Sequence, residues 1–264
     1  MNYGLQDKTA VVLAGTRGLG YAVAEALARE GCRVALCSRT QAHVTDAAAR
    51  LGKIVPAEHI HAAVADVNAP EALSAFLDAA AQRLGPPAIL VTNAGGPPTG
   101  TFESCDDDAW HAAFELTFMS AVRAARHVLP AMRAARWGRI VAITSVAVKQ
   151  PLPNLVLSNA IRAGLTGCFK TLAAEVAADG VTVNCVCPGY TRTERLETLA
   201  AQLADAQHCS TDEIVARWTA AIPSGRLATP AEFASAVCYL CSTQAASITG
   251  TSLWVDGGFY RGLL

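Results

Sequence analysis

The sequence TAVVLAGTRGLG (residues 9–20) contains the change of pattern that decides the fold. Ala10–Leu13 is a short apolar run that predicts a buried parallel strand, and Tyr21–Arg29, rich in alanine and leucine, predicts a helix. The turn between them contains Gly15, Gly18 and Gly20. Backbone N–H groups at a helix N-terminus attract negative charge, so the turn predicts a binding site for the phosphates of a dinucleotide. Glycine turns also arise for steric reasons alone, so the prediction depends on the rest of the chain.

Short apolar runs alternate with alanine-rich helical segments along the remaining chain. The further predicted strands are Arg33–Cys37, His61–Ala65, Ala88–Val91, Arg139–Ile143, Val181–Cys187 and Leu253–Val255. Strands separated by helices imply a doubly wound parallel sheet that binds ligands at the carboxyl ends of its strands. The predicted fold class is therefore α/β, a single Rossmann-like domain over residues 1–264 with helices on both faces of the sheet. Polar helical stretches predict a lid around residues 190–225.

Composition limits the partners of this domain. The chain has 264 residues, of which 52% are hydrophobic, and this is enough for one sizeable core. A formal net charge of −1 provides no field to attract nucleic acid or anionic lipid. No apolar run approaches the roughly 18 residues of a membrane span, and the N-terminus lacks a signal pattern. We expect a cytoplasmic protein with no nucleic-acid partner and no membrane association.

The nine cysteines do not predict a metal site. Cys185 and Cys187 alternate along a predicted apolar strand, whereas Cys238 and Cys241 lie one turn apart in a helical pattern. Both pairs are interpreted as buried core thiols, because the single Cys-x-x-Cys spacing has no second pair nearby. The expected compartment is a reducing one.

Further motifs follow the glycine turn at the ends of the predicted strands. In order, they are Gly15, Thr16, Arg17, Gly18, Leu19 and Gly20, then Asp66 and Val67, then Asn93, Ala94 and Gly95, then Ser145, and finally Pro188 and Gly189 followed by Thr191 and Thr193. In this order and spacing the chain resembles the short-chain dehydrogenase/reductase family over essentially its whole length, and within it the 3-oxoacyl reductases. The resemblance implies that a nicotinamide dinucleotide is held by the residues of these motifs other than Ser145 and Thr193.

The resemblance also assigns separate parts of the cofactor. Asp66 would hold the adenine, Asn93–Gly95 would line the floor beneath the nucleotide, and Pro188 with Gly189 would bracket the nicotinamide carboxamide. Each motif alone has a plainer interpretation. Asp66 could cap the helix that begins at Pro70, Asn93–Gly95 could be a simple turn, and Pro188 with Gly189 could only end a strand.

Charge after the second predicted strand favours NADP(H) over NAD(H). A chain that prefers NAD places a carboxylate near Ser38 to bind the ribose 2′-hydroxyl, but here Arg39 follows Ser38. The guanidinium of Arg39 suits a 2′-phosphate, and Arg17 could reach the same group from the glycine turn. The alternative is that both arginines are solvated surface residues.

The family's catalytic pattern is a serine, a tyrosine thirteen residues later and a lysine four residues further, with an asparagine from the preceding long helix. Counted from Ser145, the tyrosine and lysine positions hold Ser158 and Arg162, and the asparagine position falls on Thr117. A serine hydroxyl is far less acidic than a phenol, so Ser158 cannot replace the tyrosine unaided. Arg162 can still bind ribose hydroxyls of the cofactor, but a guanidinium is a poor proton relay.

Two side chains are candidates for the missing proton donor. Lys149 lies in the loop after Ser145, where partial desolvation could draw its pKa toward neutrality. Tyr190 follows Pro188 and Gly189 and could place a phenol in the site. The plainer interpretations are a solvent-facing lysine and a packing tyrosine. Asp106–Asp108 and His111 are interpreted as a helix start and solvated surface.

We therefore expect an NADP(H)-dependent oxidoreductase that reduces a carbonyl, or oxidises a hydroxyl, of a small and possibly acyl-type substrate. Ser145 would orient the oxygen, Arg162 would hold the cofactor, and Lys149 or water would supply the proton. The alternative is a catalytically silent dinucleotide-binding subunit or sensor that partners an active homologue, and a weaker one is a non-redox lyase or dehalogenase. The resemblance implies a homo-oligomer, a tetramer or dimer, with contacts through Trp110–Met132, Ala160–Ala177 and the C-terminal strand.

Overall fold

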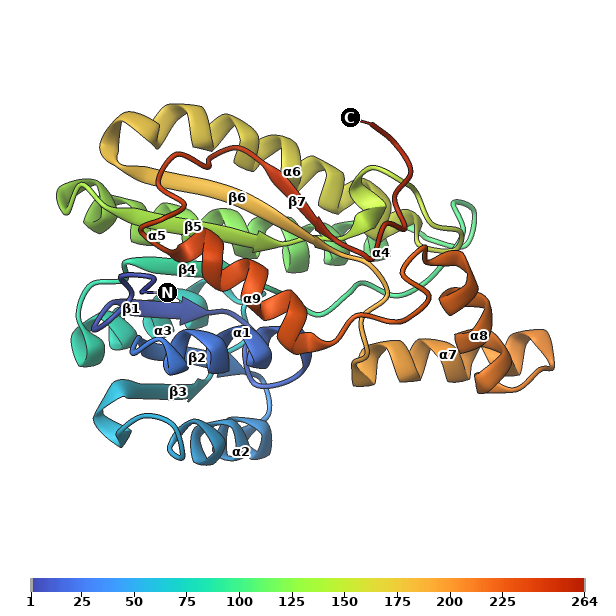
Figure 1. Cartoon of the computed structure of the whole chain (residues 1–264), viewed down its shortest axis with the longest axis horizontal. Helices are drawn as coiled ribbons and strands as arrows, with labels where there is room; N and C mark the ends of the chain where they lie inside the picture. Colours follow the sequence, from blue (N-terminus) through green and yellow to red (C-terminus); the bar gives the residue numbers. More distant parts are fainter. Residues whose placement is uncertain (1, 264) are drawn as a thin grey trace.

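A computed structural model describes residues 2–263 and contains one seven-stranded sheet in the order β3-β2-β1-β4-β5-β6-β7 (Figure 1). All neighbouring strands pair in parallel. The strands are β1 (Thr9–Val12), β2 (Arg33–Ser38), β3 (Ile60–Val64), β4 (Ile89–Thr92), β5 (Gly138–Ile143), β6 (Val181–Pro188) and β7 (Ser252–Val255). The predicted fold class is confirmed, and every predicted strand is present with its ends within one residue.

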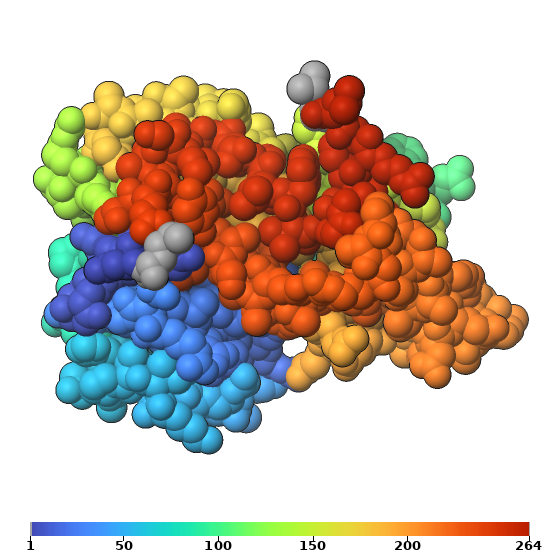
Figure 2. Space-filling model, viewed as in Figure 1, coloured from blue at the N-terminus to red at the C-terminus, as the bar shows by residue number. Residues whose placement is uncertain are grey.

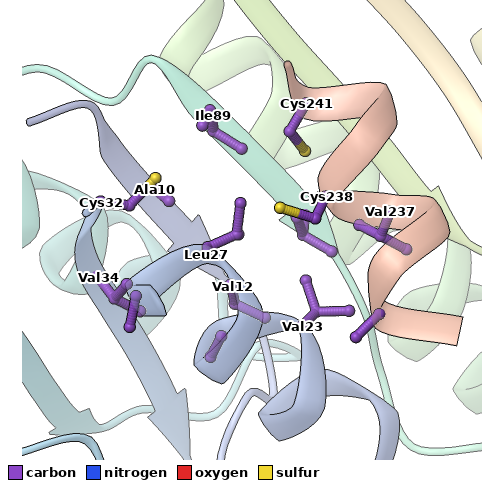
Figure 3. Close-up of a cluster of buried hydrophobic side chains, with 14 of the residues drawn as sticks. Ala10, Val12, Val23, Leu27, Cys32, Val34, Ile89, Val237, Cys238 and Cys241 are labelled. Atoms are coloured by element: carbon purple, nitrogen blue, oxygen red, sulfur yellow. The ribbon is translucent and has the colours of Figure 1, made fainter. Parts of the chain in front are cut away.

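Helices cover both faces of the sheet. One face carries α1 (Gly18–Arg29), α2 (Gln41–Leu51) and α9 (Pro230–Cys241), and the other carries α3 (Pro70–Leu84), α5 (Ser120–Ala134) and α6 (Val156–Val176). Val12 packs into the first layer and Val11 into the second, so β1 is buried on both sides. This burial explains why Ala10–Leu13 is an unbroken apolar run. Figure 3 shows Val12 beside Val23 of α1 and Val237 of α9. Short 3₁₀ helices lie at Ala57–His59, Val146–Val148 and Ala177–Asp179.

The cysteines predicted to be core thiols are buried. Cys185 and Cys187 lie within β6, and Cys238 and Cys241 belong to the α1–α9 layer (Figure 3). Burial raises the pKa of both Cys185 and Cys238 to about 12, so these thiols are protonated at neutral pH. Among residues 2–263 no cluster of histidine, cysteine and carboxylate side chains could hold a metal ion.

The segment predicted as a lid is a helical hairpin that projects beyond the carboxyl ends of the strands (Figures 1 and 2). It consists of α7 (Glu194–Gln207) and α8 (Thr211–Ala221). Tyr190 joins the hairpin to the body of the protein: its ring stacks on Trp218 at 5.0 Å and meets the edge of Phe259 at 5.3 Å. The hairpin therefore has a small apolar cluster of its own, which holds it over the sheet edge.

The long helix expected over Trp110–Met132 is not continuous. It consists of α4 (Asp107–Ala113), a π-helical stretch over Phe114–Met119, and α5. Asp106 caps α4 by accepting the Ala109 N–H at 2.9 Å, which confirms the predicted helix start. Single π turns frequently occur at functional sites, and this one contains Thr117. No helix in the described part of the chain is long and apolar enough to cross a membrane.

Candidate functional site

A cavity of about 420 Å³ opens at the carboxyl ends of β1, β4, β5 and β6, where the order of the sheet reverses. Parallel strands end at the same edge, so segments far apart in the sequence meet there. Predicted residues that line this cavity are Arg17, Gly18, Leu19, Asn93, Ala94, Gly95, Ser145, Arg162 and Pro188. Lining residues that were not predicted as site residues are Ala14, Gly96, Ile143, Thr144, Thr193, Glu194 and Arg195.

Two glycines of the glycine turn, Gly15 and Gly20, are packed too tightly for a side chain. A Cβ atom on Gly15 would lie 2.8 Å from the Val12 carbonyl oxygen, and one on Gly20 would lie 2.7 Å from Asn93 Nδ2. Asn93 in turn donates from Nδ2 to the Ala14 carbonyl oxygen at 3.1 Å, which ties the loop after β4 to the turn. No side chain caps the N-terminus of α1, so its first N–H groups are free to bind an anion.

Basic side chains gather at the glycine-turn end of the cavity. Arg17 forms an ion pair with Glu194 of α7, and its Nη1 lies 3.3 Å from Nε2 of His43 in α2. Arg39 is exposed just after β2, and within the described residues it forms no ion pair. Arg39 and Ser38 do not line the cavity, and they stand further along the same sheet edge.

Asp66 and Val67 follow β3 at this edge. The Asp66 carboxylate accepts the N–H of Asn68 at 2.9 Å, which forms a local turn. The N-cap of α3 is Ala69, and no side chain caps that helix. The interpretation of Asp66 as a helix cap is therefore wrong. Neither Asp66 nor Val67 lines the cavity.

Ser145 stands at the opposite end of the cavity, between β5 and the 3₁₀ helix Val146–Val148. Its Oγ accepts the N–H of Ala147 at 3.1 Å, so its own hydroxyl hydrogen remains available to a ligand oxygen. Pro188 and Gly189 end the neighbouring strand β6. A Cβ atom on Gly189 would lie 2.7 Å from Asp256 Cβ, so only glycine allows this close approach. Thr191 is buried and donates from Oγ1 to the Gly189 carbonyl at 3.3 Å, which supports this loop from behind.

Arg162 of α6 brings a buried positive charge to the same end. Its Nη1 donates to the carbonyl oxygens of Ile143 at 3.0 Å and Thr144 at 3.2 Å. Burial, and then the charge of Arg195, lower the pKa of Arg162 to about 10. The guanidinium is therefore still cationic at neutral pH. Within residues 2–263 no carboxylate pairs with it.

A second, much smaller cavity of about 10 Å³ lies behind Arg162. Thr92 and Thr117 line it, and the Oγ1 atom of each is buried without a hydrogen-bond partner among the described residues. A polar cavity of this size holds about one water molecule. The π turn thus places Thr117, which we expected at the asparagine position of the catalytic pattern, in a small cavity that Arg162 also lines.

Comparison with known proteins identifies the family. The family model described as enoyl-(acyl carrier protein) reductase matches residues 13–260. The 3-oxoacyl-[acyl-carrier-protein] reductase of Vibrio cholerae is 34% identical, with 97% of this chain and 98% of that protein covered. The chain belongs to the short-chain dehydrogenase/reductase family.

Two solved members of the family have similar structures. The L-sorbose reductase of Gluconobacter frateurii, solved with NADPH and L-sorbose, superposes with a TM-score of 0.94 at 33% identity over all of both chains. A short-chain oxidoreductase of Pseudomonas aeruginosa, solved with NADPH and described as containing an atypical catalytic centre, has a TM-score of 0.85 at 33% identity. That comparison covers 98% of this chain and 99% of the Pseudomonas chain.

The remaining predicted residues of this short-chain dehydrogenase/reductase lie outside the main cavity. Ser158 is partly buried on α6, one turn before Arg162. Lys149 is exposed and lines a separate cavity beside Lys170 and Trp254. Tyr190 packs between Trp218 of the α7–α8 hairpin and Phe259 of the C-terminal loop, and burial raises the pKa of its phenol. The structure therefore brings Ser145 and Arg162 together but does not bring Lys149 or Tyr190 to them.

Proposed function

We propose that this protein is an NADP(H)-dependent reductase that converts the carbonyl group of a small molecule into a hydroxyl. The observation that carries the proposal is one continuous cavity with an uncapped helix N-terminus and Arg17 at one end and Ser145 with Arg162 at the other. The cavity thus offers an anion site and a hydrogen-bond donor at its two ends. Relatives with about one third identity are ketoacyl reductases, and one is a sorbose reductase solved with NADPH.

The residues present fit a phosphorylated nicotinamide dinucleotide. The free N–H groups of α1 suit the pyrophosphate, and Arg17 and Arg39 suit a 2′-phosphate, since β2 ends on Ser38 rather than on a carboxylate. When bound, NADPH would supply the hydride for the carbonyl carbon. The preference for NADP(H) agrees with the relatives whose structures contain NADPH.

The active site we propose is an atypical one for the family. Ser158 and Arg162 occupy the positions that are tyrosine and lysine in the family pattern. Ser145 donates its free hydroxyl hydrogen to the substrate carbonyl oxygen, and the buried guanidinium of Arg162 holds the ribose hydroxyls of the cofactor. Lys149 belongs to a different cavity, so water is the proton donor that we favour. The Pseudomonas relative, which contains an atypical catalytic centre, supports the proposal that members of this family can depart from the usual pattern.

Turnover of NADPH with a panel of ketones, aldehydes and 3-oxoacyl thioesters tests the proposal. Ser145→Ala should lower kcat by ~100-fold or more, because it removes the hydrogen bond to the reacting oxygen. Ser235→Ala, on the exposed face of α9, is the matched control and should leave kcat unchanged. Binding of NADPH without reduction of any carbonyl would refute the enzyme proposal and favour the silent-subunit alternative.

Cofactor choice has its own test. Arg39→Gln and Arg17→Gln should each raise KM for NADPH by ~10-fold and leave KM for NADH nearly unchanged, because only NADPH carries the 2′-phosphate. Equal affinity of the wild-type protein for the two cofactors would contradict the assignment of these arginines.

The homo-oligomer stays a prediction. A groove between α5 and α6, lined by Leu129, Phe169 and Leu172, lies on the helices that we expect to form contacts. Light scattering of the purified protein would measure the oligomeric state directly.

A further inference from the structure

Arg195 is a residue of the cavity that no motif predicts. It lies in the first turn of α7, and its Nη2 donates to the carbonyl oxygen of Pro97 at 3.3 Å. The same nitrogen would lie 3.4 Å from a Cβ atom on Gly96, in the loop after β4. The neighbouring Glu194 instead pairs with Arg17 of the glycine turn. The first turn of α7 therefore places a carboxylate against Arg17 of the glycine turn and a guanidinium against the loop after β4.

Arg195 and Arg162 create an uncompensated positive charge in this part of the cavity. Both residues line it together with Ser145, and the charge of Arg195 is the largest cause after burial of the lowered pKa of Arg162. Neither guanidinium forms an ion pair anywhere in the described chain. Glu194 is the one carboxylate among the described lining residues, and Arg17 already neutralises it.

The cofactor would not supply the missing negative charge. The phosphates of a dinucleotide belong at the glycine turn and beyond β2, next to Arg17 and Arg39. The nicotinamide ring and ribose of NADPH, which would lie toward Ser145, carry no anion. Both arginines line the cavity, Arg162 as a buried residue and Arg195 as an exposed one. An anion that binds between them offsets the cost of the buried charge and accepts charge-assisted hydrogen bonds from Arg195. That anion must then come from the other ligand of the site, the substrate.

We propose that the substrate is an oxo-carboxylic acid whose carboxylate binds to Arg195 beside Arg162 while its carbonyl oxygen accepts the hydrogen bond from Ser145. This inference rests on the proposed function and specifies its substrate class. The Arg195 guanidinium has five N–H donors and donates one hydrogen bond to the Pro97 carbonyl oxygen among the described residues, so donors remain for a carboxylate. A hydride would add to the carbonyl carbon, the carbonyl oxygen would take a proton from water, and the product would be the hydroxy acid with its carboxylate unchanged.

Pairs of an oxo acid and its methyl ester test the inference, because the ester keeps the carbonyl and loses the charge. A 2-oxo acid and a 3-oxo acid, each with its ester, cover the two shortest spacings. In the wild-type protein the acid of at least one pair should have the higher kcat/KM. Arg195→Gln should lower that kcat/KM by ~10- to 100-fold, which is the effect expected for one charged hydrogen bond. The kcat/KM of the ester and the KM for NADPH should not change.

Two further variants separate charge from structure. Arg195→Lys keeps the positive charge and should restore part of the preference for the acid. Arg192→Gln is the matched control, since Arg192 is exposed, lies three residues earlier in the same segment and lines a different cavity. It should leave both the acid and the ester kinetics unchanged.

A binding measurement gives a readout that does not need turnover. A saturated carboxylic acid that lacks the reducible oxo group should bind to the NADPH-bound protein and change the nicotinamide fluorescence, and Arg195→Gln should weaken that binding. Absence of any Arg195-dependent binding would overturn the inference. If Arg195→Gln raises KM for NADPH equally with the acid and the ester, then Arg195 binds a cofactor phosphate and the inference is wrong.

The inference and the proposed function fail in different ways. Equal reduction of acid and ester would overturn the inference and leave the reductase proposal standing. Oxidation of NADPH by none of the acids, esters or neutral ketones would overturn the proposed function, and the substrate class with it.

Discussion

Replacing Arg162 with methionine should abolish function without destabilising the protein. Arg162 is buried, and among the described residues its guanidinium donates hydrogen bonds to two carbonyl oxygens, those of Ile143 and Thr144. Burial lowers its pKa from the ordinary guanidinium value to about 10, and this shift corresponds to an order-of-magnitude cost of about 3 kcal/mol for keeping the charge in the folded protein at neutral pH. The two lost hydrogen bonds are worth ~1 kcal/mol each. We therefore expect Arg162→Met to change the free energy of unfolding by about zero to +1 kcal/mol.

The difference in the free energy of unfolding between Arg162→Met and the wild type should depend on pH with a definite sign. Below pH 10 Arg162 is charged in both the folded and the unfolded state, so the wild-type protein carries the full cost of burial. Between the folded pKa of about 10 and the higher pKa of the unfolded state, the unfolded state binds more protons, and the stability of the wild type rises with pH. The stability advantage of Arg162→Met should therefore begin to shrink as the pH passes through about 10.

Urea unfolding at pH 7, 9 and 10.5 would check the predicted stability of the variant. NADPH binding, measured by nicotinamide fluorescence, would check the predicted loss of function. Binding of NADPH and carbonyl reduction should be strongly reduced in the variant, because no donor remains for the ribose hydroxyls. A loss of more than about 2 kcal/mol of stability at pH 7 would show that Arg162 is a net stabilising group. It would refute the expectation that the cost of burying the charge outweighs the two hydrogen bonds. Unchanged NADPH affinity would refute its role in binding.

Two other substitutions probe the scaffold. Thr229→Ala removes the hydroxyl half of the capping box at the start of α9, in which Thr229 Oγ1 accepts the Glu232 N–H, and should lower the free energy of unfolding by ~1 kcal/mol in urea. Ser235→Ala within the same helix should change it by less than ~0.5 kcal/mol. Gly20→Ala places a Cβ atom 2.8 Å from the Ala14 carbonyl and should cost ~1–3 kcal/mol and weaken NADPH binding. Its control is Gly167→Ala, where nothing lies within 4 Å of the added atom, and helix propensity should raise stability by ~0.5–1 kcal/mol. A Gly20→Ala variant as stable as wild type would contradict the packing of the turn.

Local sequence patterns predicted the scaffold well because the physical cause of each element is local. Ala10–Leu13 could be read as a buried strand because both of its faces are covered, and β1 occupies Thr9–Val12. Glycines in the first turn were recognisable because a Cβ atom at Gly15 or Gly20 would collide with neighbouring atoms. The same patterns could not show that the helix after Asp106 contains a π turn, since π and α turns share almost the same residue preferences.

The sequence alone determined the sheet, its carboxyl edge and the pairing of Ser145 with Arg162, because β-strand ends and helical spacing follow from periodicity. Only the tertiary structure decided which charged and phenolic side chains reach that edge. Lys149 is four residues from Ser145 yet lines another cavity, whereas Arg195 reaches Pro97 across 98 residues of chain. The reason is that the packing of separate elements determines where a long side chain can lie. For Arg195 that position depends on α7, which packs in one apolar cluster with Trp218 and Tyr190. No local sequence pattern encodes this packing.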